Sequence, residues 1–196
     1  LVLIQNSTAS PFALRLEELD QALSEKVPLG DKCIPNPYKT WDQIQTGLSS
    51  SPIRIFGPAS STGTYDILIE KLMNRCGPFL RHDKAYIESP TNENLIVQKV
   101  LSRADTLGIV TFSFYEQNKR RLHAIPLNGI LPSRKSIQEQ SYPLSRPLYL
   151  YMKTNDLSQH PDRKAYAIEF TSSEAIGEKG YLTKKGLIPL VAPEQK

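Results

Sequence analysis

The chain has 196 residues, 39% of them hydrophobic and 22% charged, a length and composition that allow a sizeable core and exclude a disordered or fibrous protein. No run of apolar residues is long enough to cross a membrane as a helix. The net charge of +4 is spread along the chain rather than gathered in a stripe, which favours a small anion or an acidic partner over a nucleic acid.

The first part of the chain is predicted to contain a strand, a helix and a long loop. Leu1–Gln5 is an apolar run typical of a buried strand, and Leu14–Leu23 has the spacing of an amphipathic helix. Residues 27–51 are rich in Pro, Gly, Ser and Asn, so we expect mostly loop there. Trp41 is expected to anchor that loop in the core.

The stretch from Ile53 to Asp66 is the most informative in the chain. Ile53–Phe56 is predicted to be a short strand, Gly57–Thr64 is a loop of small and hydroxylated residues, and a helix follows. The apolar residues of this helix recur at steps of three and four, which indicates one buried stripe. They are Tyr65, Leu68, Ile69, Leu72, Met73 and Cys76, and Gly77 and Pro78 end the helix.

Strands and helices are predicted to alternate through the rest of the chain. The expected strands are Leu107–Phe112, Leu122–Pro126 and Leu148–Met152. The expected helices are Leu95–Leu101, Ser113–Lys119 and Arg163–Thr171. Thr91–Asn94 is expected to start the first of them. In the last, Ala165, Tyr166 and Phe170 are expected to face inward. Residues 128–142 are expected to be loop, and Lys119-Arg120-Arg121 a solvated helix end. This alternation is typical of an α/β fold with helices on the faces of a sheet.

The cysteines and histidines predict no metal site. Cys33 and Cys76, the two cysteines, lack the CxxC spacing of zinc sites. The histidines are scattered, at His82, His123 and His160. The two cysteines would form a disulfide in an exported protein or serve as buried apolar side chains otherwise, and the sequence leaves both open.

The loop before the central helix has the composition of an oxyanion-binding site. In α/β folds, ligands bind beyond the carboxyl ends of the strands, where helix N-termini present unpaired N–H groups. Here Ser60, Ser61, Thr62 and Thr64 add hydroxyl donors, and Gly63 allows close approach to the backbone. A helix cap needs only one hydroxyl, so four favour a ligand.

Three other interpretations compete for this loop. A nucleotide P-loop requires a lysine before the final Ser or Thr, and none separates Gly63 from Thr64. Ser60 or Ser61 could be a nucleophile, but the G-x-S-x-G pattern is absent. The loop could also cap its helix and bind nothing, an interpretation that composition alone leaves open.

The order of several motifs resembles one known family. The motifs are Leu16-Glu-Glu-Leu19, Lys39-Thr-Trp-Asp-Gln-Ile44, Ile55–Asp66, Glu93-Asn-Leu-Ile-Val-Gln98, Leu107–Phe112 with Tyr115, and Tyr142–Tyr151. In this order they resemble the periplasmic phosphate-binding proteins of ABC transporters, which have the type II solute-binding fold. The family's Ser-Gly-Thr phosphate motif falls on Thr62-Gly63-Thr64, preceded by Ser60 and Ser61.

The resemblance implies that the chain captures inorganic phosphate and is not an enzyme. Ser60, Ser61, Thr62, Gly63 and Thr64 would bind phosphate without a cofactor, and an inner-membrane ABC permease would be the partner of this periplasmic protein. A related oxyanion carrier, a weak phosphate sensor and a phosphate-ester hydrolase are the alternatives. Many members of the family carry an arginine where this chain has Gly57-Pro58-Ala59, so Arg54 or Arg103 is a candidate to offset the ligand's charge.

The resemblance also implies two lobes joined by crossover strands. Residues 6–146 would form the second lobe, residues 147–196 would return to the first, and Leu1–Gln5 and Leu148–Met152 would cross between them. The first lobe's own phosphate loop would precede Leu1, so that lobe is incomplete here. An incomplete sheet exposes an edge and apolar surface, which predicts self-association.

Overall fold

The computed structural model describes residues 1–11, 13–72, 75–89 and 92–190 of the chain. They form two compact units, which we call the sheet unit and the helical unit. The sheet unit comprises Leu1–Pro132 with Tyr142–Leu144, and the helical unit comprises Ser133–Ser141 with the chain from Ser145 onward. Within the described residues, no helix is long and apolar enough to span a membrane.

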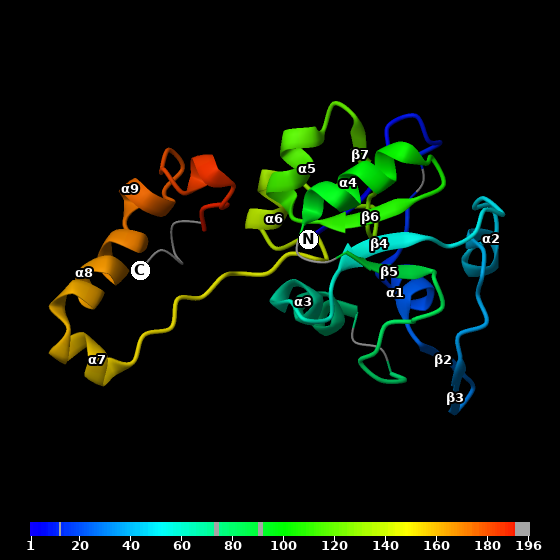
Figure 1. Cartoon of the computed structure of the whole chain (residues 1–196), viewed down its shortest axis with the longest axis horizontal. Coiled ribbons are helices and arrows are strands. Elements are labelled where there is room, and N and C mark those ends of the chain that lie inside the picture. The colour runs from blue at the N-terminus through cyan, green and yellow to red at the C-terminus, as the bar shows by residue number, and fades with distance from the viewer. Residues whose placement is uncertain (12, 73–74, 90–91, 191–196) are drawn as a thin grey trace. The chain divides into compact units, whose positions relative to one another are not determined.

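The sheet unit is built on one mixed sheet with the strand order β5-β4-β6-β1-β7 (Figure 1). Its strands are β1 (Val2–Asn6), β4 (Ile55–Pro58), β5 (Tyr86–Ser89), β6 (Leu107–Val110) and β7 (Leu122–Ala124). Strands β4, β5 and β6 are parallel to one another, whereas β1 is antiparallel to both of its neighbours. The three parallel strands therefore end at one edge of the sheet.

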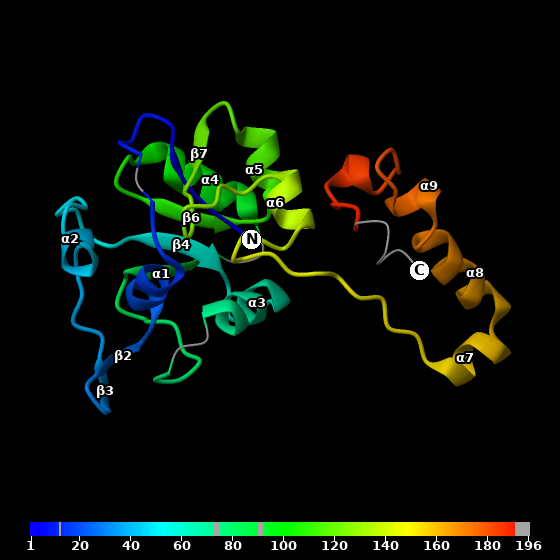
Figure 2. The ribbon, with the colours of Figure 1, turned by 180° about the vertical axis from the view of Figure 1, so that it is seen from behind.

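Helices cover both faces of this sheet. The helices of the sheet unit are α1 (Leu16–Leu23), α2 (Trp41–Ile44), α3 (Gly63–Leu72), α4 (Glu93–Ser102) and α5 (Phe112–Asn118). In Figures 1 and 2, α4 and α5 lie on one face of the sheet and α1 and α3 on the other. Every residue of β6 is buried, as expected for a strand covered on both sides. Side chains of β1, α4 and β6 share one apolar cluster with Leu122.

Local apolar patterns predicted most of the sheet unit correctly. The predicted strands at residues 1–5, 53–56, 107–112 and 122–126 correspond to β1, β4, β6 and β7, and the predicted helices to α1, α3, α4 and α5. Met73, part of the predicted stripe, and Thr91, part of the predicted helix start, lie outside the described residues. Strand β5 was not predicted, since Tyr86-Ile-Glu-Ser89 has neither an apolar run nor an alternation of apolar and polar residues.

The region from 27 to 51 is more ordered than predicted. A hairpin forms from β2 (Lys26–Leu29) and β3 (Lys32–Pro35), and α2 follows. Trp41 begins α2 and is only 3% exposed, which confirms its place in the core. The structure also answers the question that the sequence left open about the cysteines, because Cys33 of β3 is bonded to Cys76.

The helical unit contains no strand among its described residues. Its helices are α6 (Arg134–Gln138), α7 (Thr154–Gln159), α8 (Pro161–Phe170), α9 (Ser173–Ile176) and the 3-10 helix η1 (Thr183–Lys185). The prediction of loop for residues 128–142 is wrong at α6, where Ser133 supplies an N-cap by accepting from the Ser136 N–H. The prediction of helix at 163–171 is confirmed by α8.

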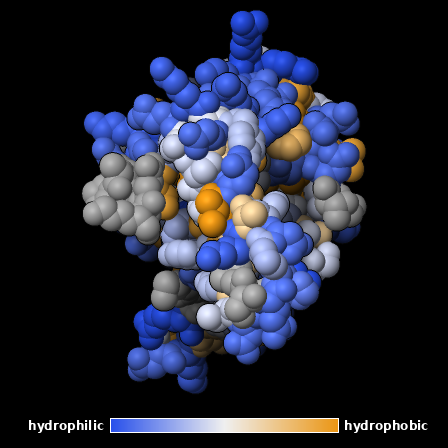
Figure 3. Space-filling view, turned by 90° about the vertical axis from the view of Figure 1, so that its left-hand side faces the viewer, coloured by the Kyte–Doolittle hydropathy of each residue, from blue (hydrophilic) through white to orange (hydrophobic). Residues whose placement is uncertain are grey.

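Two predictions about the helical unit are wrong for the same reason. Leu148–Met152 is not a strand, and Leu148 and Tyr151 are 68% and 86% exposed. In α8, Ala165 and Tyr166 are exposed rather than inward, and Phe170 is only partly buried. In both segments the apolar residues have the expected spacing, but the described elements leave most of them exposed. The face of the molecule seen in Figure 3 is mostly hydrophilic, with hydrophobic residues only in small groups.

Candidate functional site

The hydroxylated loop lies at the edge of the sheet where the parallel strands end. It joins β4 to α3, while β5 leads to α4 and β6 leads to α5. Three helices thus begin near the ends of three neighbouring strands, and each brings unpaired N–H groups and the positive end of its dipole to this edge. The expected placement of residues 60–64, after a strand and at the start of a helix, is therefore correct.

Ser60 is bound to a carboxylate of the protein itself. Its backbone N–H and its Oγ both donate to Glu88 Oε2, each at 3.0 Å. Glu88 is on β5, paired with Gly57 of β4, so strand register places it beside the loop. Two of the donors expected to bind a ligand therefore bind a carboxylate of the protein in this structure.

Thr62 caps the helix that follows it. Its Oγ1 donates to the carbonyl of Ala59 at 2.7 Å and accepts from the N–H of Tyr65 at 3.3 Å. These are the bonds that an N-terminal cap makes. The Thr62 side chain therefore caps α3, as in the alternative in which the loop only caps its helix.

The remaining donors of the loop are free. The N–H groups of Ser61, Gly63 and Thr64, and the hydroxyls of Ser61 and Thr64, have no hydrogen-bond partner in the described part of the chain. Ser61 and Gly63 are exposed, and Thr64 is partly buried. Because N–H groups in the first turn of a helix lack intrahelical partners, these donors are available to a bound anion.

Two tyrosines form the base of the loop. Tyr86 is buried and donates its hydroxyl to the carbonyl of Pro58 at 2.6 Å, and its ring centroid lies 6.4 Å from that of Tyr65. A Cβ on Gly57 would lie 2.6 Å from the Tyr86 ring, so only glycine lets the ring pack this closely. Burial raises the pKa of both tyrosines, with Glu88 adding to the effect, so both hydroxyls stay neutral.

Side chains of Asn92 and Glu93 bind backbone N–H groups at the starts of α4 and α5. Glu93 accepts from both the N–H and the Oγ1 of Thr111, which fixes the beginning of α5 against α4. Asn92 caps α4 by accepting from the Asn94 N–H at 2.9 Å. The helix start expected just before Leu95 is thus capped by Asn92.

Neither arginine proposed from the sequence lies at this edge, so that expectation is wrong. Arg54 directly precedes β4 and Arg103 precedes β6, which places both at the opposite ends of the parallel strands. Each binds Asp105, at 3.4 Å and 3.0 Å. Since their charges are paired at the far edge of the sheet, they cannot offset the charge of an anion held by the loop.

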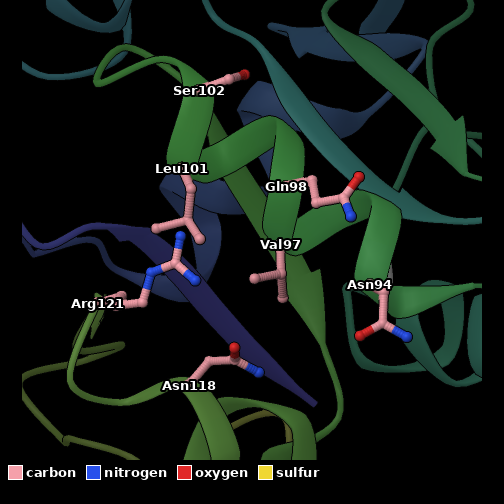
Figure 4. A pocket seen from close by; sticks show the side chains of 7 residues that line it. All are labelled: Asn94, Val97, Gln98, Leu101, Ser102, Asn118 and Arg121. Atoms are coloured by element: carbon pink, nitrogen blue, oxygen red, sulfur yellow. The ribbon is translucent and has the colours of Figure 1, made fainter.

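A separate hollow of about 420 Å³ lies away from the loop (Figure 4). Side chains of α4 line one side, and Asn118 and Arg121 line the other. Arg121 is the single charged residue among those that line it, and no residue of the loop takes part. The free donors of the loop therefore do not face this hollow. Nearby, Lys119, Arg120 and Arg121 are all exposed at the end of α5, as predicted.

The chemistry that this arrangement supports is anion binding. A serine nucleophile needs a base within hydrogen-bond reach, and the free Ser61 hydroxyl has none among the described residues. The partner of Ser60 is a carboxylate that accepts two bonds, and the histidines are exposed elsewhere. In the part of the chain that the structure describes, no group of His, Cys, Asp and Glu side chains could hold a metal ion.

Sequence comparison places the chain beside solute-binding proteins. The model of the PBP superfamily domain matches residues 1–174. The chain is 34% identical over 154 residues to phosphate-binding protein PstS of Staphylococcus haemolyticus, covering 74% of the chain and 46% of that protein. It is 31% identical over 160 residues to protein SphX of Synechocystis, and the match covers 79% of this chain and 45% of SphX. The chain thus spans less than half the length of the curated relatives it matches.

Solved structures show the same fold. A possible phosphate-binding protein from Planctomyces limnophilus superposes with a TM-score of 0.74 at 21% identity, and the match covers 99% of this chain and 65% of the Planctomyces chain. A second structure, of a Clostridium perfringens protein described as a substrate-binding protein of a phosphate ABC transporter, was solved with bound phosphate. It superposes with a TM-score of 0.70 at 18% identity, and the match covers 96% of this chain and 68% of the Clostridium chain. These likenesses confirm the α/β fold of the type II solute-binding kind that the sequence predicts.

Proposed function

Because this chain belongs to the PBP superfamily, we propose that it is the phosphate-capturing part of a solute-binding protein that serves an ABC importer. The curated relatives named above support phosphate as the ligand. The observation that carries the proposal is the set of free donors on Ser61, Gly63 and Thr64 at the start of α3. A tetrahedral oxyanion has several acceptor oxygens that these groups would bind.

The five loop residues have different roles in this proposal. Ser61, Gly63 and Thr64 donate to phosphate, Thr62 holds the helix start in place through its cap, and Ser60 positions Glu88. The sequence-based assignment of all five to phosphate binding is kept as a proposal, with direct contact assigned to the three that are free.

The loop alone supports only weak binding. A hydrogen bond to a charged acceptor contributes about 1.5–3 kcal/mol, while association costs at least about 4 kcal/mol in lost freedom. A few such bonds yield a net free energy near 4 kcal/mol, which corresponds to millimolar affinity. Micromolar affinity needs about 8 kcal/mol, so a second set of donors is required.

We propose that this second set belongs to another lobe. Residues 6–146 would be the lobe that carries the loop, and residues 147–196 would belong to the other lobe. The exposed segment Leu148–Tyr151 is apolar and makes no strand here, which suits a strand that pairs with chain outside this sequence. Without that partner, two copies of the chain would associate through this segment, as light scattering would detect.

The whole protein would work outside the cytoplasm. The Cys33–Cys76 disulfide is typical of proteins in an oxidising compartment such as the periplasm. A membrane permease that accepts the loaded protein is the proposed partner. An enzyme that hydrolyses phosphate esters would use the same donors, but the Ser61 hydroxyl has no base beside it among the described residues.

Titration by nuclear magnetic resonance would test the proposal, since it detects millimolar binding residue by residue. Phosphate added to the ¹⁵N-labelled chain should shift the amide signals of Ser61, Gly63 and Thr64 in a saturable way. Ser61→Ala combined with Thr64→Val should weaken the response, while Ser102→Ala, in the hollow, should not. Phosphate that shifts only signals outside the loop would refute the proposal. Release of product from a chromogenic phosphate ester, lost in Ser61→Ala, would favour the hydrolase.

A further inference from the structure

The hollow beside α4 has the size and lining of a site for a small organic molecule. Its volume of about 420 Å³ lies within the range of about 300–1,000 Å³ that is typical of ligand pockets. All the residues that line it belong to the sheet unit. In Figure 4, Val97 and Leu101 extend from α4 toward Arg121 and Asn118. An apolar surface therefore lies next to one positive charge, and a ligand of this hollow would have to match both.

Arg121 presents an unpaired guanidinium from a fixed backbone. Its N–H donates to the carbonyl of Asn118 at 2.9 Å, and its own carbonyl accepts from the N–H of Ser7 at 3.1 Å. The guanidinium has no ion pair or hydrogen bond with any described residue. By contrast, the charge of Lys119 is paired with Glu116 at 3.2 Å. The Arg121 side chain is therefore available to an anion that enters the hollow.

The amide side chains of the lining have unused hydrogen-bonding groups. The side chains of Asn94 and Gln98, both on α4, make no hydrogen bond within the described residues. Asn118 uses one amide hydrogen, which it donates to a backbone carbonyl of α5 at 2.9 Å. Because an amide group has both donors and acceptors, a hydroxyl or amino group on the ligand would find a partner here.

The charge of the lining favours a carboxylate over inorganic phosphate. Arg121 is the single charged residue among those that line the hollow, so the site matches one negative charge. A carboxylate carries one charge, and its two oxygens accept in parallel from the guanidinium fork. Inorganic phosphate has a higher charge at neutral pH and no apolar part to cover Val97 and Leu101.

We propose that this hollow binds a small aliphatic carboxylate that also bears a hydroxyl or amino group. Arg121 would bind the carboxylate, Val97 and Leu101 would contact the aliphatic chain, and the free amide groups would bind the polar substituent. The site is separate from the proposed phosphate site, because no residue of the hydroxylated loop lines the hollow. The inference therefore goes beyond the proposed function and does not depend on it.

Titration of the ¹⁵N-labelled chain with the hydroxy-acid analogue of leucine tests this inference. This probe carries a carboxylate, a hydroxyl and a branched aliphatic chain, and it should shift the amide signals of Val97, Leu101 and Arg121 in a saturable way. Its primary amide keeps the chain without the charge, and acetate keeps the charge without the chain. Each of these two compounds, and inorganic phosphate as well, should bind at least tenfold more weakly at these signals.

Two neighbouring arginines separate specific binding from general attraction by charge. Arg121→Gln should weaken binding of the hydroxy acid at least fivefold, and Arg121→Lys, which keeps the charge but loses the fork, at least threefold. Arg120→Gln is the matched control, because it removes the same charge from an exposed residue that does not line the hollow. Binding to this variant should stay within twofold of that to the wild type.

The inference is overturned if the hydroxy acid leaves these signals unshifted in the wild-type chain, or if its amide or phosphate binds as tightly. Equal losses in Arg120→Gln and Arg121→Gln would overturn it too, since attraction by the charged end of α5 would then explain the binding. None of these outcomes bears on the proposed function, which is measured at the signals of Ser61, Gly63 and Thr64.

Discussion

Replacing Gly63 by alanine tests ligand binding with little effect on the fold. Gly63 is the first residue of α3 and is exposed, and its φ is not positive. A Cβ built on it meets no atom within 4 Å. Alanine is favoured over glycine in helices by about 1 kcal/mol at most, so Gly63→Ala should be as stable as the wild type or slightly more stable. In a chain of this size the melting temperature would rise by about 3 °C or less.

Phosphate binding should respond in the opposite direction. The added methyl group would occupy space beside the N–H that we assign to the ligand, so that hydrogen bond would be lost. A bond of about 1.5–3 kcal/mol corresponds to binding that is about tenfold to a hundredfold weaker. Titration by nuclear magnetic resonance measures this loss, and differential scanning calorimetry measures stability on the same samples.

Thr64→Ser is the matched control for this experiment. Serine keeps the backbone N–H and the hydroxyl of Thr64 and removes only a methyl group, so phosphate binding should stay close to that of the wild type. The reasoning is refuted if Gly63→Ala binds phosphate as tightly as the wild type. It is equally refuted if that variant melts well below the wild type, because the space around Gly63 would then not be open.

Three further predictions concern what holds the sheet unit together. The Cys33–Cys76 disulfide closes a loop of 43 residues, so Cys33→Ala combined with Cys76→Ala should lower the free energy of unfolding by about 4 kcal/mol in urea titrations, and an unchanged midpoint would contradict this. Hydrogen bonds from the buried Arg81 hold the pKa of Asp83 far below its ordinary value, so the stability from this pair is present above about pH 4 and is lost as pH falls further. Thermal melts from pH 7 to pH 2 should show this fall, and Asp83→Asn should be less stable at neutral pH and less sensitive to acid; an equally steep fall in the variant would count against the pair. Finally, Tyr86→Phe leaves a buried carbonyl without its donor and should cost about 1–3 kcal/mol, and a stability equal to that of the wild type would show that the bond is not needed.

The sequence alone predicted the elements whose pattern is local. Apolar runs such as Leu1–Gln5 and the stripe of α3 indicate the type of element because each contains its own periodicity. The place of the hydroxylated loop also followed, since a strand, a glycine-containing loop and a helix start are consecutive in the chain. The assignment of Ser61, Gly63 and Thr64 to ligand binding stays a prediction.

The errors arise where a segment needs a distant partner. The alternating residues of Leu148–Met152 predict a strand, but a strand forms only when another strand pairs with its backbone, and none in the described chain does. The reverse holds for β5, whose few residues show no pattern but pair with β4. In both cases the presence or absence of a pairing strand, and not the local pattern, decided whether a strand forms.

The class of fold and the position of a donor-rich loop at the end of a strand could both be predicted without the structure. The tertiary structure decided which donors remain free, because the register of β4 and β5 brings Glu88 to Ser60 across a separation of 28 residues. It likewise joined Cys33 to Cys76 and placed both candidate arginines at the opposite edge of the sheet. Side chains far apart in the chain meet only through strand pairing and packing, and no local pattern encodes those contacts.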